Sequence, residues 1–133
     1  MIVFLDSNIV IYSVEGNPLF APRVIARFAR AQAAGDTFMI SDLTRLECLV
    51  GPLKKRDAAV EANFQAFFAR PDVRVVAITA AVCDRAARIR AAHNFKQMDS
   101  LQLASAVEHG ADVFLTADAR LSSFPDIRVE ILT

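Results

Sequence analysis

The stretch Ile-Val-Phe-Leu-Asp-Ser-Asn, residues 2–8, decides the fold prediction for this chain. Four consecutive apolar residues at its start are typical of a strand buried on both faces, as strands are in a parallel sheet. The run stops at Asp6, so a carboxylate directly follows the predicted strand. In open parallel sheets, ligands bind outside the carboxyl ends of the strands. Asp6 is therefore the first candidate for a functional residue.

Outward from this strand, predicted strands and helices alternate along the rest of the chain. Apolar runs predict further strands at residues 37–40, 73–78, 112–116 and 128–132. Apolar periodicity predicts helices at 8–14, 22–34 and 98–109, one from Ser41 to a stop at Gly51-Pro52, one through Val60–Phe68, and one capped by Thr79. Such alternation predicts an α/β fold with a mainly parallel central sheet of about five strands and helices on both faces.

Length and composition indicate one compact unit. The 133 residues are close to the usual size of one domain, so we expect residues 1–133 to form a single domain. A hydrophobic content of 54% argues against disorder. No apolar run reaches the roughly 18 residues that span a bilayer, and the N-terminus lacks the basic lead-in of a signal peptide. We therefore expect a cytoplasmic protein that does not associate with membranes.

The charge balance and the cysteines exclude several function classes. Fifteen basic and fifteen acidic residues cancel, which disfavours a protein that coats nucleic acid regardless of sequence, although charge close to a site can still bind RNA. Cys48 and Cys83 have no paired spacing, and we expect both to be buried free thiols. The four glycines form no phosphate-cradling loop, which disfavours a dinucleotide enzyme or a P-loop ATPase.

Three more acidic residues fall near the edge of the sheet where Asp6 is expected. Asp118 follows the strand that ends at Thr116, Asp99 lies in the first turn of a predicted helix, and Glu47 lies in the second turn of another. Carboxylates that converge repel one another, so some of them take up protons or require a cation. Oxygen ligands favour Mg²⁺ or Mn²⁺ over Zn²⁺, and such an ion suits phosphodiester hydrolysis. Placement alone leaves open that these acids only cap helices or are solvated.

Four segments that contain these acids follow one another in a recognisable order. They are Phe-Leu-Asp-Ser-Asn-Ile at 4–9, Ser-Asp-Leu-Thr-Arg-Leu-Glu at 41–47, Met-Asp-Ser-Leu-Gln-Leu-Ala-Ser-Ala at 98–106 and Leu-Thr-Ala-Asp at 115–118. In this order the chain resembles the PIN-domain family and, within it, the VapC toxins of bacterial toxin–antitoxin pairs. Each motif alone is weak, whereas four in register along the whole chain are specific.

The resemblance implies a fold, an activity and an active site. The fold would be a PIN-like three-layer α/β/α sandwich. The activity would be that of a metal-dependent endoribonuclease, the toxin of a VapBC-type type II toxin–antitoxin system. Asp6, Glu47 and Asp99 would be catalytic and hold Mg²⁺ or Mn²⁺ directly or through water, and Asp118 would complete the set. One carboxylate would act as general base on a metal-bound water, and the products would carry a 5′-phosphate and a 3′-hydroxyl.

The resemblance also implies supporting residues and partners. Asn8 and Thr116 would orient the carboxylates and the attacking water, as metal sites generally require. Ser7 stands where the family often has Thr, so a hydroxyl is kept there. The implied partners are an RNA substrate, a VapB-like antitoxin and a second copy of the chain. The basic cluster at residues 54–56, Lys54, Lys55 and Arg56, either contacts the RNA backbone or belongs to a solvated loop or helix start.

Two other functions remain open at this point. An apolar strand followed by Asp-x-Asn imitates the nucleophile motif of haloacid-dehalogenase-like phosphatases, but Asn8 stands where that family normally has a second Asp. A covalent aspartyl-phosphate intermediate would support that alternative. The second alternative is a non-catalytic PIN module that binds RNA. A metal-dependent nuclease assay separates it from the ribonuclease.

Overall fold

A computed structural model describes all residues from Met1 to Thr133. Its centre is a five-stranded sheet in the order β3-β2-β1-β4-β5, and every neighbouring pair of strands is parallel. The prediction of an α/β fold with a mainly parallel sheet of about five strands is confirmed. The strands are β1 (Ile2–Leu5), β2 (Thr37–Ser41), β3 (Val73–Val76), β4 (Val113–Thr116) and β5 (Arg128–Ile131).

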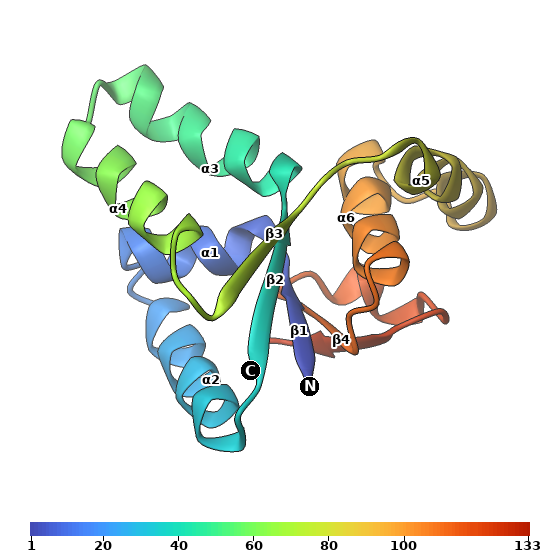
Figure 1. Ribbon diagram of the computed structural model, residues 1–133, viewed down its shortest axis with the longest axis horizontal. Coiled ribbons are helices and arrows are strands. Elements are labelled where there is room, and N and C mark those ends of the chain that lie inside the picture. Colours follow the sequence, from blue (N-terminus) through green and yellow to red (C-terminus); the bar gives the residue numbers. More distant parts are fainter.

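Helices cover both faces of this sheet. In Figure 1, α1 to α4 lie on one side of the strands, and α5 and α6 lie on the other, which is the expected three-layer arrangement. No helix has both the length and the apolar character needed to cross a membrane. The helices are α1 (Ser7–Glu15), α2 (Ala21–Ala34), α3 (Asp42–Lys55), α4 (Ala58–Phe68), α5 (Ala80–His93), α6 (Gln97–Glu108) and a 3-10 helix, η1 (Ala119–Ser123).

The strands separate two hydrophobic cores. Val3 and Leu5 belong to the core under α1 to α4, whereas Phe4 belongs to the core under α5 and α6, because neighbouring residues of a strand point to opposite faces. Phe4 also stacks on Phe114 of the next strand, with ring centroids 5.4 Å apart. Since β1 is buried on both faces, its end is held firmly in place. That end carries Asp6.

The helix after β2 differs from its prediction. We expected it to stop at Gly51-Pro52, but α3 continues through Pro52 to Lys55. A proline inside a helix removes one backbone hydrogen bond, yet Pro52 is buried, and tertiary packing can override such a local preference. The basic cluster therefore occupies the last turn and the C-cap of α3, where positive charge interacts favourably with the helix dipole.

The two cysteines are both free, but they lie in different environments. Cys48 is buried in the core under α1 to α4, as predicted. Cys83 is exposed, so the prediction of a buried thiol is wrong for this residue. Its neighbour Val82 occupies the buried face of α5, which leaves Cys83 on the outward side of the helix.

Candidate functional site

The candidate site lies where the connections of the sheet change direction. From the central strand β1, the chain first builds β2 and β3 on one side and later β4 and β5 on the other. Parallel sheets bind ligands at such a switch point, outside the carboxyl ends of the strands. Asp6 follows the end of β1, and Thr116 is the last residue of the adjacent strand β4. Their positions agree with the shared edge expected from the sequence.

Asp6 combines the role of a helix cap with direct contacts to β4. Its Oδ1 accepts a hydrogen bond of 2.8 Å from the backbone N–H of Ser7, at the start of α1. Its Oδ2 accepts one of 2.7 Å from the hydroxyl of Thr116, and its own backbone N–H donates to the carbonyl of Leu115 at 3.0 Å. Asp6 is thus fixed by two strands and a helix, and only 9% of the residue is exposed.

Burial shifts the protonation of this carboxyl group. Desolvation raises the pKa of Asp6 to about 6, and the charges of Asp99 and Glu47 act in the same direction, while the hydrogen bonds from Thr116 and Ser7 act in the opposite direction. Nearby like charges and loss of water both disfavour the ionised form. A cation next to Asp6 would therefore stabilise the ionised form of its carboxyl group.

Glu47 is joined to Asp6 through a buried polar network. The hydroxyl of Ser7 donates to Oε1 of Glu47 at 2.8 Å. The side-chain amide of Gln102 donates to the hydroxyls of Ser7, at 2.9 Å, and Thr44, at 3.1 Å, and more weakly to Glu47, at 3.4 Å. The amide oxygen of Gln102 accepts from the hydroxyl of Ser41 at 2.7 Å. This one side chain therefore connects α6 to β2, α1 and α3.

Gln102 was not among the residues predicted for the site. It is 1% exposed and lies in the interior of α6 between the apolar residues Leu101 and Leu103. A polar side chain at that position was the available signal, because a buried amide must find partners among the surrounding elements. Its position next to three hydroxyls makes it a support for the carboxylate of Glu47.

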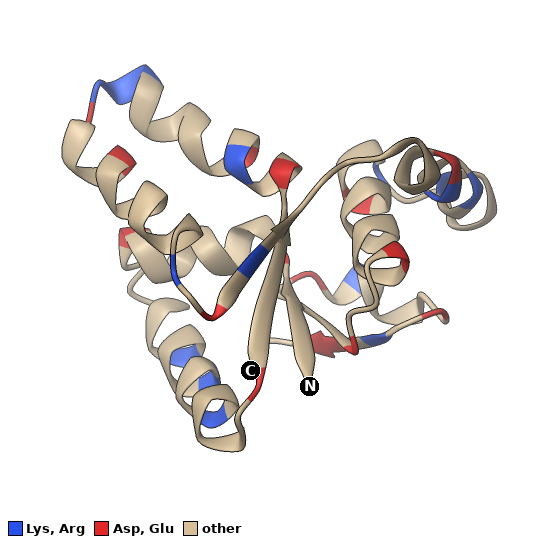
Figure 2. Ribbon diagram, in the orientation of Figure 1, with Lys and Arg blue, Asp and Glu red and all other residues tan.

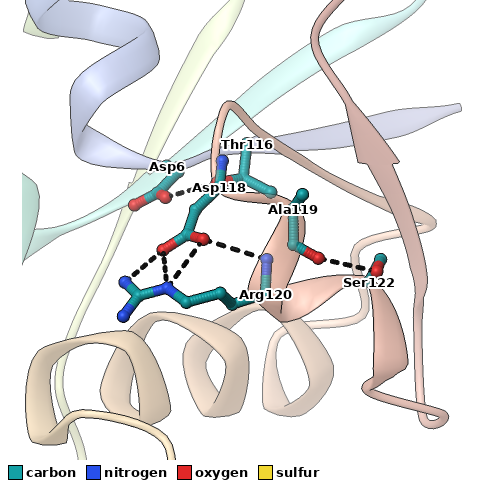
Figure 3. A network of polar contacts seen from close by, with 6 residues as sticks. All are labelled: Asp6, Thr116, Asp118, Ala119, Arg120 and Ser122. Atoms are coloured by element: carbon teal, nitrogen blue, oxygen red, sulfur yellow. Dashed lines mark hydrogen bonds and ion pairs between the residues drawn. The ribbon is translucent and has the colours of Figure 1, made fainter.

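The charges of the other two acids, Asp99 and Asp118, influence each other. Asp99 is partly buried in the first turn of α6, and burial followed by the charge of Asp118 raises its pKa. Asp118 carries a lowered pKa because Arg120 donates hydrogen bonds to it. Figure 3 shows the guanidinium group of Arg120 facing the carboxylate of Asp118, next to Thr116 and Asp6.

Of the three expected supporting residues, two contact carboxylates and one does not. Thr116 contacts Asp6 and also accepts a 3.1 Å hydrogen bond from the backbone N–H of Asp118, so its hydroxyl links two of the acids. Ser7 contacts Glu47. The side chain of Asn8 is exposed and takes part in none of these hydrogen bonds; it lines a shallow hollow that Asp118 and Arg120 also border.

The donor chemistry of the site fits a hard divalent cation. All four acids offer oxygen ligands, and burial, together with the charges of neighbouring carboxylates, raises the pKa values of Asp6 and Asp99. No three acidic, histidine or cysteine side chains are arranged to hold one ion in this structure. Mg²⁺ is usually bound through one or two carboxylates and keeps several water ligands, so it does not require such a group. Glu47 and Asp118 are meanwhile engaged with Ser7 and Arg120.

The sequence profile of the PIN domain matches residues 3–127, nearly the whole chain. The chain belongs to the PIN-domain family. This membership confirms the resemblance and leaves no support for the haloacid-dehalogenase-like alternative. No curated protein matches the sequence.

Solved structures with the same fold come from toxin–antitoxin systems. One similar chain comes from the structure of VapBC2 from Rickettsia felis bound to a promoter DNA fragment. Its TM-score with this chain is 0.83 and its identity is 18%, and the match covers 100% of both chains. DNA-bound VapBC from Salmonella typhimurium has a TM-score of 0.73 and 20% identity, covering 100% of this chain and 99% of that one. VapC20 from Mycobacterium tuberculosis, a sarcin-ricin loop cleaving toxin, has a TM-score of 0.71 and 16% identity over 95% and 98%. At these identities the similarity shows a shared fold.

Proposed function

We propose that this PIN-domain protein is a metal-dependent endoribonuclease and the toxin of a VapBC-type type II toxin–antitoxin system, acting in the cytoplasm. The observation that carries the proposal is the joined set of acids at the switch point of the sheet, in which Thr116 and Ser7 connect Asp6 to Asp118 and Glu47. The similar structures include VapBC complexes and a sarcin-ricin loop cleaving toxin, and this similarity supports the proposal.

In this proposal the four carboxylates bind the metal ion, and one of them also acts as the general base. Asp6, Glu47 and Asp99 would hold Mg²⁺ or Mn²⁺ directly or through water, and Asp118 would complete the set. When bound, the ion would supply an activated water and would stabilise charge on the phosphate oxygens. One carboxylate takes the proton of the attacking water. Attack of the water oxygen on phosphorus would break the bond to the 3′ oxygen, which takes up a proton from solvent and leaves as a 3′-hydroxyl, while the other fragment keeps a 5′-phosphate.

Removal of single carboxylates tests the site. We expect Asp6→Ala and Asp99→Asn to abolish cleavage of RNA and any growth arrest, while circular dichroism shows an intact fold. Glu108, an acid on the same helix as Asp99 that pairs with Arg85, provides a control, because Glu108→Gln removes a charge outside the site. Full activity of a contaminant-free Asp99→Asn protein would contradict the assignment.

Metal exchange tests the cofactor. We expect EDTA to stop cleavage and Mg²⁺ or Mn²⁺ to restore it, because oxygen-only ligands select hard cations. Restoration by Zn²⁺ alone would contradict the argument from oxygen ligands. A protein that binds RNA but never cleaves it, with any of these ions, would instead be the non-catalytic PIN module.

The proposed protein partners are a VapB-like antitoxin and a second copy of the chain. Leu46, Val50 and Leu53 recur along α3 and are exposed, which supports contact with a protein. Co-expression with the product of a neighbouring short reading frame, followed by affinity capture and measurement of mass in solution, tests both partners. A chain that remains monomeric and unbound under these conditions would contradict them.

A further inference from the structure

A small cavity beside Asp99 is bordered by two cationic side chains. Its volume is about 110 Å³, several times the roughly 30 Å³ that one water occupies in the liquid. Lys96 reaches it from the start of α6, and Arg120 reaches it from η1. The remaining lining residues are Asn94, Phe95, Asp99 and Leu121. Cations from two separate elements thus border the same cavity as the carboxylate of Asp99.

Arg120 is held in this region by Asp118 alone. Its Nη2 donates to Oδ2 of Asp118 at 2.6 Å, and its Nε lies 3.0 Å and 3.1 Å from the two carboxylate oxygens. The guanidinium side chain is nevertheless 64% exposed, so solvent and ligands can reach it. Both oxygens of Asp118 are occupied as long as this pairing persists.

Lys96 forms no ion pair in the structure, although its charge acts against the rise in the pKa of Asp99 and contributes to the lowered pKa of Asp118. Its ammonium group is therefore available to an anion.

The chemistry of the substrate supplies a reason for these cations. A phosphodiester is an anion, and a site built from carboxylates repels it. Figure 2 shows Lys and Arg dispersed over helices on both sides of the sheet rather than gathered on one face, so attraction must come from charges near the site. Phosphate contacts by Lys and Arg supply much of the affinity for nucleic acids.

We propose that Lys96 and Arg120 form a phosphate-binding site next to Asp99, which grips a backbone phosphate of the RNA. Arg120 exchanges its partner: it binds Asp118 in the free protein and turns to the RNA phosphate in the complex. This exchange frees Oδ2 of Asp118, while Oδ1 keeps its hydrogen bond from the backbone N–H of Arg120 at 3.0 Å. The inference rests on the proposed function, since it requires RNA as the ligand.

Binding of RNA at several salt concentrations tests the phosphate site. The probe is a fluorescein-labelled single-stranded RNA of mixed sequence, and anisotropy is measured in an Asp6→Asn background with Mg²⁺, so that the probe is not cleaved. The logarithm of the RNA association constant falls linearly with log[KCl]. In a variant that has lost its contact with one phosphate of a single strand, this fall should be less steep by about 0.7. Arg120→Gln and Lys96→Gln should each show this reduction.

Arg128 provides a matched control. Its side chain is 67% exposed, close to that of Arg120, and it makes only a 4.0 Å ion pair with Glu130. It is the first residue of β5 and therefore lies at the amino ends of the strands, whereas Asp6 and Asp118 follow their carboxyl ends. Arg128→Gln should keep the slope of the parent. If Arg120→Gln or Lys96→Gln keeps that slope as well, the two-cation site is overturned.

A double-mutant cycle tests the exchange. Asp118→Asn frees Arg120, so it should tighten RNA binding by about two- to fivefold, the range given by an exposed ion pair. In the Arg120→Gln protein the same change should have a clearly smaller effect. Equal tightening in both backgrounds would mean that Asp118 only repels RNA and would refute the exchange.

The outcomes separate this inference from the proposed function. If the wild-type protein cleaves RNA but the salt slopes do not change, the nuclease function stands and the phosphate site falls. If the slopes change as expected but the wild-type protein cleaves no RNA with Mg²⁺ or Mn²⁺, the phosphate site stands and the nuclease function falls.

Discussion

Replacing Asp6 by Asn should make the stability of the protein less sensitive to pH. The pKa of Asp6 rises from 3.8 to about 6 on folding, chiefly because the group is buried. The folded protein therefore binds the proton more tightly than the unfolded chain, and its free energy of unfolding falls as the pH rises from about 4 to about 6. Above that range the ionised carboxylate costs about 3 kcal/mol, since each pKa unit corresponds to about 1.4 kcal/mol.

The substitution also removes a hydrogen-bond acceptor. Asp6 accepts from both Ser7 and Thr116, whereas the single oxygen of an Asn side chain cannot fully replace both oxygens, at a cost of about 1 kcal/mol. The expected net effect of Asp6→Asn at neutral pH is a gain of about 1–2 kcal/mol in the free energy of unfolding. The difference between variant and wild type should grow by about 2 kcal/mol between pH 4.5 and pH 7.5.

Urea unfolding in EDTA, followed by circular dichroism at several pH values, measures this difference directly. Asp84→Asn is the control for loss of a charge, because Asp84 is exposed on α5, which lies on the other side of the sheet from α1, the helix that Asp6 caps. Stability curves of Asp6→Asn and wild type that run parallel over this pH range would refute the raised pKa. A gain that disappears when Mg²⁺ is added would show that a cation offsets the cost of the buried charge.

Two further substitutions probe the polar contacts of the fold. Gln102→Leu should lower the free energy of unfolding by about 2–4 kcal/mol, because the buried hydroxyls of Ser41 and Thr44 lose their partner. It should also slow RNA cleavage, because Glu47 is no longer held. Urea unfolding and initial rates of cleavage measure the two effects, and unchanged stability would contradict the network. Arg27 and Glu130 form a largely buried ion pair at 2.6 Å. Arg27→Met should lower the free energy of unfolding by about 2–3 kcal/mol, because it leaves the charge of Glu130 without this partner. The double variant with Glu130→Met should recover much of the loss in the same unfolding assay.

Local sequence patterns were sufficient to predict most of the fold. The apolar run before Asp6 indicated a strand buried on both faces, and Thr79 was correctly predicted to cap α5, since its hydroxyl accepts from the backbone N–H of Val82. The helix stop at Pro52 failed because burial of that residue is a property of the whole fold. The exposure of Cys83 was missed for the same reason, since cysteine is buried on average but not at every position.

The candidate site was predictable only in part. The order of the acidic motifs predicted which residues would share one edge of the sheet, and Thr116 and Ser7 contact carboxylates there. The partners of Gln102 could not be read from the sequence, because they come from three separate elements. The pairing of Arg120 with Asp118 could not be read from the sequence either, because it depends on the turn into η1 that follows Asp118.

The middle position of β1 has a consequence for how the protein is made. Although β1 is translated before every other strand, one of its edges stays unpaired until β4 has been synthesised, and the contact between Asp6 and Thr116 spans 110 residues. Contacts of such long range form late, because the intervening chain must first be closed into a loop. A nascent chain on the ribosome therefore lacks the complete acidic site until Asp118 has emerged.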